Sequence, residues 1–251
     1  MAEPLLVVRG LRKRFGGLVA TDGVDLEVAE SETLAVIGPN GAGKTTLIAQ
    51  LSGDLVPDAG VIRFAGEDVA GRAAPARSRR GLARSFQITS IFREFSALDN
   101  VALAVQAHAG HSFRFWRPAA GERALREPAR AVLEQVGLAA RADVPAGALA
   151  HGEQRQLEIA MALATRPRLL LLDEPVAGMG TDESQRMVQL LRTLRSRHTL
   201  VLVEHDMDVV FALADRISVM VYGRVIASGA PEAIRVNPEV RRAYLGEEVP
   251  A

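Results

Sequence analysis

The sequence of 251 residues lacks cysteine, lacks long apolar runs and has no excess of charge of either sign. Without cysteine, the chain can form no disulfide, no thiol nucleophile and no cysteine-ligated zinc site. Lys+Arg 30 balance Asp+Glu 30, whereas a general nucleic-acid-binding protein usually carries a basic excess, so we expect no nucleic-acid partner. No apolar run approaches the roughly 18 residues of a membrane-spanning helix, and the N-terminal sequence lacks the order of a signal peptide. These absences predict a cytoplasmic protein.

The pattern that is present is that of an α/β protein, long enough for one large domain or for a core with a smaller lobe. Strand-like stretches occupy 24–28, 33–38 and 60–66, and apolar residues at helical spacing occupy 43–52. In the second half of the chain, helical patterns alternate with apolar, strand-like runs. The helical patterns are 153–165, 182–196 and a further helix after 205, and the apolar runs are 168–174, 199–205 and 216–229. This alternation predicts a parallel sheet covered by helices on both faces.

The middle of the chain differs from its flanks. A helical pattern extends over about 97–137, broken by "GHSFRFWRP" (110–118), and an irregular linker follows over 140–150. Together they predict a second, helical lobe. The preceding stretch "AGRAAPARSRRG" (70–81) has the composition of a loop, and we expect its arginines to form a solvated face.

A glycine-rich segment directly after a buried strand and before a helix fits the phosphate-binding loop pattern in full. It consists of Gly38, Pro39, Asn40, Gly41, Ala42, Gly43, Lys44, Thr45 and Thr46. Its glycines let backbone N–H groups converge on phosphate oxygens at the positive end of the following helix. Lys44 would reach the β- and γ-phosphates, and the Thr45 hydroxyl would bind Mg²⁺. Because chance would produce this pattern in only about one such chain in a hundred, we predict an ATP site.

An acidic pair ends the buried run "RLLLLDEP". Asp173 would stand at a strand end, where a second protein ligand for Mg²⁺ is needed. Glu174 could accept a proton from, or orient, the water that attacks the γ-phosphate. The alternative is that both residues simply finish a strand and cap the next segment. The phosphate-binding loop favours the catalytic interpretation.

Three further residues are weak candidates when taken singly. His205 ends the buried run "TLVLVEHD" and would lie at the same sheet edge as Asp173, although Asp206 could simply be the N-cap of the next helix. A histidine at a strand end is more often structural, a lone glutamine such as Gln87 is usually a surface residue, and a lone phenylalanine such as Phe15 usually belongs to the core. These residues gain weight only as a set.

Taken as a set, the residues and their spacing resemble the ATP-binding subunit of an ABC transporter over nearly the whole chain. The set comprises Phe15, Gly38–Thr46, Gln87, Leu149–Glu153, Asp173–Glu174 and His205. The resemblance implies that Phe15 stacks on adenine and that Gln87 joins Mg²⁺ and the attacking water to the helical lobe. It also implies that His205 contacts the γ-phosphate.

The same resemblance implies a fold and a division into domains. The fold would be α/β, with a P-loop NTPase (RecA-like) core, an N-terminal antiparallel β subdomain and a helical lobe. The ATP-binding core would comprise 1–88 and 148–229, and the C-terminal helical extension 230–251. The helical lobe would comprise 89–147, with its last helix continuing to about 165.

The segment "LAHGEQ" resembles the family signature, usually written LSGGQ, which in the ATP-bound dimer caps the nucleotide held by the opposite subunit. The contacts implied here are those of Ala150, His151, Gly152 and Glu153. Ala150 stands where the signature has serine, and His151 replaces its first glycine, so one hydrogen bond of typically ~1.5–3 kcal/mol is missing. Gly180 likewise stands where relatives often have asparagine or aspartate.

Longer stretches, among them "RSFQITSIFREFSALDNV" and "PEVRRAYLGEE", resemble the branched-chain amino acid uptake branch. Its members import branched-chain or other hydrophobic amino acids, amides, urea or related small compounds. The resemblance implies a homodimer or heterodimer of ATP-binding subunits, two membrane permeases and, indirectly, a periplasmic substrate-binding protein. It places the chain on the inner face of the cell membrane and the substrate contacts in the partners.

The apolar residues after Gln87 allow two interpretations. Ile91, Phe92 and Phe95 could form much of the surface that docks on the permease, because apolar side chains exposed without a partner are costly. They could equally pack inside the helical lobe.

Other functions fit the sequence less well than import. An ATPase for lipopolysaccharide export has a similar length and C-terminus, but its signature normally retains the serine that Ala150 replaces. Soluble ABC factors that act on ribosomes or DNA usually carry two fused cassettes or a long coiled-coil insertion. A small-molecule kinase would explain neither "LAHGEQ" nor His205.

Overall fold

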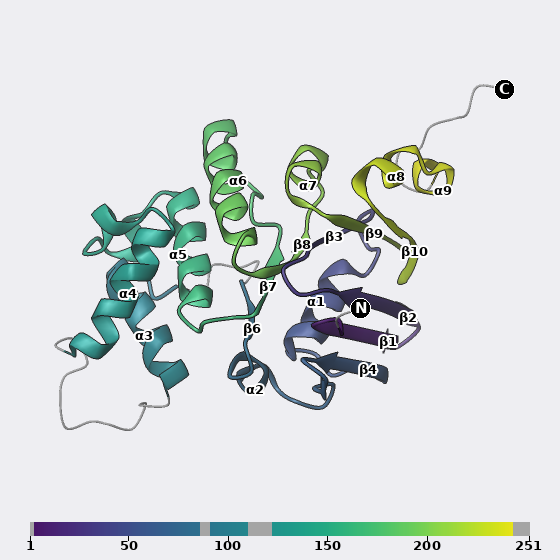
Figure 1. Ribbon diagram of the computed structural model, residues 1–251, viewed down its shortest axis with the longest axis horizontal. Coiled ribbons are helices and arrows are strands. Elements are labelled where there is room, and N and C mark those ends of the chain that lie inside the picture. Colours follow the sequence, from purple (N-terminus) through teal and green to yellow (C-terminus); the bar gives the residue numbers. More distant parts are fainter. Residues whose placement is uncertain (1–2, 86–90, 110–121, 243–251) are drawn as a thin grey trace.

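The computed structural model describes residues 3–85, 91–109 and 122–242, which form two β-sheets, helices packed between and against them, and a helical region at one end (Figure 1). The first sheet is antiparallel, with the strand order β2-β1-β4-β5. Its strands are β1 (Leu6–Phe15), β2 (Leu18–Val28), β4 (Ala59–Phe64) and β5 (Glu67–Asp68). All four come from the N-terminal part of the chain, as the expected antiparallel subdomain requires.

The second sheet has six strands in the order β10-β9-β3-β8-β7-β6. They are β3 (Thr33–Ile37), β6 (Leu82–Arg84), β7 (Leu169–Asp173), β8 (Thr199–Val203), β9 (Arg216–Val221) and β10 (Arg224–Gly229). All neighbours are parallel except β10, which pairs antiparallel with β9. Every residue of β3, β7 and β8 is buried, as expected for parallel strands covered on both faces. The predicted parallel sheet is confirmed.

Helices cover the two faces of this sheet, and alternate residues of the central strands serve opposite faces. On one side lie α6 (Thr181–Arg195) and α7 (Met207–Leu213), and on the other lies α1 (Lys44–Ser52), between the two sheets (Figure 1). Leu170 packs in the cluster that includes α6, whereas its neighbour Leu171 packs with α1 and the antiparallel sheet. The antiparallel sheet therefore closes over α1 and fixes the helix that follows the glycine-rich loop.

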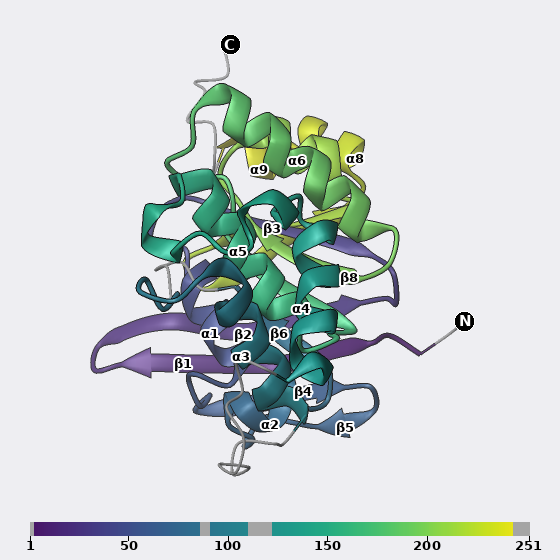
Figure 2. The ribbon, with the colours of Figure 1, turned by 90° about the vertical axis from the view of Figure 1, so that its left-hand side faces the viewer.

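A helical region occupies one end of the molecule and faces the viewer in Figure 2. It contains α3 (Ala97–Ala109), α4 (Arg123–Gln135) and α5 (His151–Leu163), with short 3₁₀ turns at Ala139–Arg141 and Ala146–Ala148. Leu98 of α3, Leu125 of α4 and Leu157 of α5 belong to one buried cluster, which continues into the side chains of β7. The helices predicted in this region are confirmed, while the domain boundaries stay a prediction.

The arginine-rich stretch before β6 corrects one expectation. Part of it forms a short helix, α2 (Ala74–Ser78), and the expected solvated face is wrong for Arg77, which is 1% exposed. Its guanidinium donates to the carbonyls of Gln50 and Leu51, each at 2.7 Å, and to Ala70 O at 3.0 Å. The last carbonyls of a helix have no hydrogen-bond donors within the helix, and the Arg77 guanidinium provides these donors for α1.

The C-terminal part of the described chain contains α8 (Pro231–Val236) and α9 (Pro238–Val240). They pack through Ile234 and Val240 on a cluster formed with β3 and β9. The expected C-terminal helices are therefore short, and residues 243–251 of the predicted extension lie outside the described part. Within the described ranges, no helix is both long enough and apolar enough to span a membrane.

Candidate functional site

Three loops meet at one edge of the six-stranded sheet because β3, β8 and β7 are parallel neighbours. The glycine-rich loop follows β3, Asp173 ends β7, and His205 lies just beyond the end of β8. The carboxyl ends of parallel strands face the same edge, where open α/β sheets bind their ligands. The sheet thereby gathers the groups that were predicted from widely separated segments.

Two glycines of the loop are required by the close approach of other backbone segments. A Cβ atom at Gly38 would lie 2.0 Å from Met220 O, and one at Gly43 would lie 2.0 Å from Ala20 O. Gly43 also has a φ of 100°, a conformation that favours glycine. Gly41 is exposed, with nothing within 4 Å of its would-be Cβ, so the outer side of the loop is open to a ligand.

The loop ends at the N-terminus of α1, where the N-cap is Gly43, which has no side chain to accept a hydrogen bond from the first amides. Along the rest of the segment, Asn40 and Thr45 are exposed, Pro39 and Thr46 are half-buried, and Ala42 is buried. Uncapped amides and the positive end of the helix dipole favour an anion here. This geometry fits a phosphate group.

Lys44 lies inside the loop, with 8% of its surface exposed. Its Nζ donates to Gly38 O at 2.6 Å and to Pro39 O at 3.0 Å. Burial lowers the pKa of the Lys44 ammonium, and the carboxylates of Glu174 and Asp173 oppose this shift. The cation is therefore held among carbonyls at the point where phosphate oxygens would offer stronger, charge-assisted partners.

Asp173 is 1% exposed, and its two carboxylate oxygens differ. Oδ2 accepts a hydrogen bond from Arg84 Nη2 at 3.1 Å, while Oδ1 has no hydrogen-bond partner among the described residues. Burial raises the pKa of the Asp173 carboxyl, and Arg84 counteracts part of this effect. Arg84 also donates through Nη1 to Asp54 Oδ2 at 2.8 Å, so it links the end of β7 to the segment after α1. Sequence reasoning missed Arg84, which has no motif of its own.

The unpartnered Oδ1 of Asp173 tests whether these residues fit Mg²⁺. A buried carboxylate oxygen, on a side chain that interacts electrostatically with Lys44 of the loop, is a suitable oxygen ligand for that cation. In the described part of the chain no cluster of three or more His, Cys, Asp or Glu side chains could hold a metal ion by itself. The residues therefore fit a cation that is shared with nucleotide phosphates, with Thr45 as the second protein ligand.

Glu174 and His205 lie side by side on the loops after β7 and β8. The Glu174 carboxylate oxygen Oε1 is 3.8 Å from His205 Nδ1, and the Glu174 amide donates to Val203 O at 2.9 Å. Glu174 has a φ of 48°, an unusual conformation for a residue with a side chain and one that is often found at functional sites. His205 is 60% exposed, so its ring can meet a ligand. Asp206, as expected, caps α7 by accepting from Asp208 N and Val209 N.

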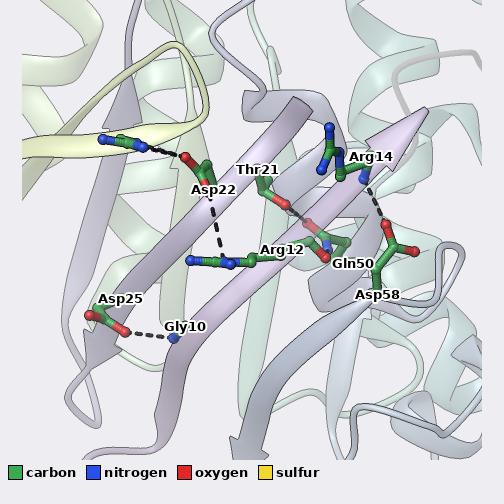
Figure 3. Close-up of polar contacts among 9 residues, drawn as sticks. Gly10, Arg12, Arg14, Thr21, Asp22, Asp25, Gln50 and Asp58 are labelled. Carbon is green, nitrogen blue, oxygen red and sulfur yellow. Dashed lines mark hydrogen bonds and ion pairs between the residues drawn. The ribbon is translucent and has the colours of Figure 1, made fainter. Parts of the chain in front are cut away.

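Phe15 stands at the end of β1, in the hairpin that crosses over α1. Its ring is 49% exposed, and Lys13 Nζ lies 5.8 Å from the ring centroid. Figure 3 shows the polar contacts that hold this hairpin: Asp58 accepts from Arg14 N at 2.7 Å, and Thr21 Oγ1 contacts Gln50 of α1 at 3.1 Å. These contacts hold the hairpin that carries Phe15 against α1, the helix that begins with Lys44.

The signature-like segment, Leu149–Glu153, forms the start of α5, with Ala150 as N-cap. Ala150 and His151 are exposed, and the Ala150 amide donates to Glu153 Oε2 at 2.9 Å. Arg141 also donates to Glu153, through Nε at 3.0 Å. Burial acts to raise the pKa of the Glu153 carboxyl, but the hydrogen bonds from Ala150 and Arg141, together with the charges of Arg141 and Arg186, lower it overall. The contacts of this segment thus run to the helical region. A Cβ added at Gly152 would lie 3.2 Å from the Glu183 carboxylate at the start of α6.

The predicted site residues therefore fall into two groups. The structure brings together the phosphate loop, Asp173, Glu174 and His205 through the contacts given above. The signature-like segment is a separate group on α5. Gln87 lies outside the described residues.

A glycine-rich loop between a buried strand and a helix, with a carboxylate at the end of a nearby parallel strand, defines a P-loop nucleotide-binding protein. Residues 21–177 match the family described as ABC transporter, and 224–250 match one described as Branched-chain amino acid ATP-binding cassette transporter. The chain belongs to the ATP-binding subunits of ABC transporters, and it binds ATP as that family does.

Relatives and solved structures match the chain over its whole length. The high-affinity branched-chain amino acid transport ATP-binding protein BraF of Pseudomonas aeruginosa is 44% identical, over 98% of this chain and 100% of its own. LivG of Escherichia coli, named in the same way, is 41% identical over the same shares. The crystal structure of the ADP conformation of MJ1267, an ATP-binding cassette of an ABC transporter, has a TM-score of 0.86 and 29% identity, covering 98% and 100% of the two chains. These findings confirm the predicted family and fold class.

Proposed function

We propose that the chain is the ATP-hydrolysing subunit of an importer for branched-chain amino acids or related small compounds. The main support for the proposal is structural: the phosphate loop, Asp173, Glu174 and His205 lie together at one edge of the six-stranded sheet. Full-length relatives named for high-affinity branched-chain amino acid transport support the choice of cargo. The proposed partners are a second ATP-binding subunit, identical or related, two membrane permeases and, indirectly, a periplasmic substrate-binding protein. The subunit would act at the inner face of the cell membrane.

In the proposed ATP site, Phe15 stacks on adenine and the loop from Gly38 to Thr46 surrounds the phosphates. Lys44 exchanges its contacts with Gly38 O and Pro39 O for oxygens of the β- and γ-phosphates, where its charge is better matched. Thr45, Asp173 and Gln87 would hold Mg²⁺, which supplies positive charge to the γ-phosphate and the leaving group. The unpartnered Oδ1 of Asp173 supports this role.

For hydrolysis, Glu174 accepts a proton from the water that attacks the γ-phosphate, or orients that water. His205 contacts the γ-phosphate from the neighbouring loop, and its 60% exposure leaves the ring accessible. Gln87 joins the reacting water to the helical lobe. The separation of 3.8 Å between the Glu174 and His205 side chains supports a shared reaction centre.

The signature-like segment would act on the neighbour's nucleotide. Ala150, His151, Gly152 and Glu153 lie at the start of α5, and a helix start favours an anion. Two subunits would close on two ATP molecules, so that each segment caps the γ-phosphate bound at the opposite Lys44. Hydrolysis would reopen the dimer and move the permeases.

The helical lobe, residues 89–147, would transmit this movement. Phe92 and Phe95 are 54% and 46% exposed, and their rings stack with centroids 5.6 Å apart, which supports a docking surface for the permease. Ile91 is partly buried against the core of the lobe, so the alternative of internal packing applies to that residue. Cross-linking from Arg93 or Glu94 to a permease would test the docking surface, and failure along the whole stretch would contradict it.

Transport by the assembled complex tests the proposal as a whole. The chain should be co-expressed with candidate permeases and a substrate-binding protein of the proposed transporter class, and uptake of labelled leucine, isoleucine and valine should be measured in vesicles loaded with ATP. Uptake that needs ATP and is lost in Lys44→Ala supports import. An ATP-dependent export of lipopolysaccharide, or an ATPase that co-purifies with no membrane protein, would favour the alternatives.

A further inference from the structure

Glu204 is a fully buried acidic residue to which the proposed mechanism gives no role. Its exposure is 0%, and it lies between the last residue of β8 and His205. Burial raises the pKa of the Glu204 carboxyl, while hydrogen bonds from backbone amides oppose that rise. A carboxyl group is costly to bury unless its oxygens are hydrogen-bonded, so its contacts explain its position.

Those contacts join two loops of the site. Glu204 Oε1 accepts from Val176 N at 3.2 Å, and Oε2 accepts from His205 N at 3.1 Å. Val176 is the second residue after Glu174, on the loop that follows β7. One carboxyl group therefore connects the backbone just beyond Glu174 to the backbone of His205.

The connection matters because the side chains on these loops are close but do not hold each other. Glu174 Oε1 and His205 Nδ1 are 3.8 Å apart, beyond hydrogen-bond distance. The hydrogen bond from the Glu174 amide to Val203 O fixes the start of the loop after β7. The hydrogen bond from the Val176 amide to Glu204 fixes the next part of that loop. The Val176 amide bond to Glu204 is buried and the His205 amide bond is partly buried, so a loop that moved alone would take a donor away from its acceptor.

We propose that Glu204 is a positioning residue for ATP hydrolysis, which sets the distance between Glu174 and His205 by holding both loops through their backbone amides. The inference rests on the proposed roles of Glu174 and His205. Reactions of this kind are sensitive to position, and a displacement of about 1 Å can lower the rate by about 100-fold.

Glu204→Gln tests the proposal in the full-length chain. Glutamine keeps the shape and one acceptor oxygen, but it turns an NH₂ donor towards one of the two amides. We expect kcat for ATP hydrolysis to fall about 10- to 100-fold, as a small misplacement predicts, with KM and the affinity for a fluorescent ATP analogue unchanged. Glu204→Asp, which keeps the charge but is one methylene shorter, provides a second variant if the amide prevents folding.

Asp206→Ala is the matched control. It removes the cap of α7 from the same turn but leaves the backbone amides that Glu204 holds. We expect a lower Tm with turnover close to that of the parent. If Asp206→Ala lowers turnover in proportion to its Tm, as Glu204→Gln does, then the effect of Glu204 is only one of stability and the proposal is overturned.

A double-mutant cycle gives the sharper result. If Glu204 acts through His205, then Glu204→Gln combined with His205→Ala should be nearly as active as His205→Ala alone. Fully additive losses would overturn the positioning role while leaving His205 in the proposed mechanism. If His205→Ala hydrolyses ATP at the parent rate, the assignment of His205 itself fails, and the Glu204 inference fails with it.

Discussion

The N-termini of α1 and α5 are both proposed to hold phosphate, but they are built in different ways. At α1, Gly43 is pressed against Ala20 and Lys44 lies inside the loop, so the cation and the open amides belong to one rigid unit. At α5, Ala150 and His151 are exposed, and the nearest charge is Glu153, which is paired with Arg141. The cation beside the α5 start, Arg141, is thus already paired with a carboxylate.

This difference implies that the α1 site can bind its ligand without the α5 site, whereas the α5 site needs a nucleotide held at the α1 site of a partner. The α1 site gathers Lys44, Asp173 and Glu174 within one chain, so it should bind ATP in an isolated subunit. The α5 site offers backbone donors, a helix dipole and the exposed His151 side chain, which add at most a few kcal/mol to an anion that is already held elsewhere. It should therefore matter only when a partner presents its nucleotide.

The largest expected effect is that of Lys44→Ala. The variant should lose ATP binding or bind it far more weakly, because the ammonium neutralises charge at the β- and γ-phosphates. Equilibrium binding of labelled ATP measures this, with the exposed Arg79→Ala as a control for loss of a positive charge. Unchanged affinity would remove the phosphate-loop assignment and with it the contrast between the two helix starts.

Glu174→Gln should separate binding from turnover at the α1 site. Magnesium-ATP binding should persist while hydrolysis falls by about 100-fold or more, because the amide keeps the shape but accepts no proton. Sedimentation should show an ATP-stabilised dimer. The exposed Glu239→Gln serves as the control. Hydrolysis at the parent rate by Glu174→Gln, with permeases present, would show that Glu174 is not the base.

Gly152→Asp should abolish transport-coupled hydrolysis and leave ATP binding to the isolated subunit intact, because the new charge would face the partner's γ-phosphate. A Cβ at this position also lies 3.2 Å from the Glu183 carboxylate, so Gly152→Asn is the control for packing without charge. Mixed dimers of Gly152→Asp with an unaltered chain show which site fails. Loss confined to the variant's own Lys44 site would contradict a contact across the dimer.

Arg84→Met should destabilise the α1 site in a pH-dependent way. Removing one partner of a hydrogen bond to a charged group typically costs ~1.5–3 kcal/mol in the free energy of unfolding. Without Arg84 the pKa of Asp173, already raised by burial, should rise further. The folded variant would then hold a proton that the unfolded chain releases, so its stability falls as pH rises above the ordinary carboxyl range. Denaturant unfolding should show the largest difference from the parent at neutral pH and a smaller one in acid; a constant difference would contradict this.

Ala150→Ser should have the smallest effect, a modest gain in ATP-driven dimerisation. It restores one hydroxyl beside backbone donors that already favour the anion. Analytical ultracentrifugation with the Glu174→Gln background measures the dimer constant, and His151→Gly tests the second departure in the same way. An effect as large as that of Gly152→Asp would mean that the side chain, and not the backbone, holds the partner's phosphate.

Much of the α1 site could be predicted from the sequence because its parts are local. A strand, a glycine loop and a helix follow one another within residues 33–52, and a buried apolar run ends at Asp173. Such patterns depend on neighbours in the chain. The exposed Phe92 and Phe95 could not be assigned to surface or core, because helix packing decides between these outcomes.

Local pattern by itself predicted the phosphate loop, the buried strands β3, β7 and β8 and the longer helices, but it missed α2 and β6. Only the tertiary structure decided the roles of Arg77, Arg84 and Glu204, each of which has at least one partner far away in the sequence. Arg77, expected at the surface, is buried because the carbonyls at the end of α1 need donors. Arg84 and Glu204 are placed by a buried carboxylate and by buried amides. The sequence shows that such polar groups are present. Which of them pair with each other depends on which strands become neighbours in the sheet.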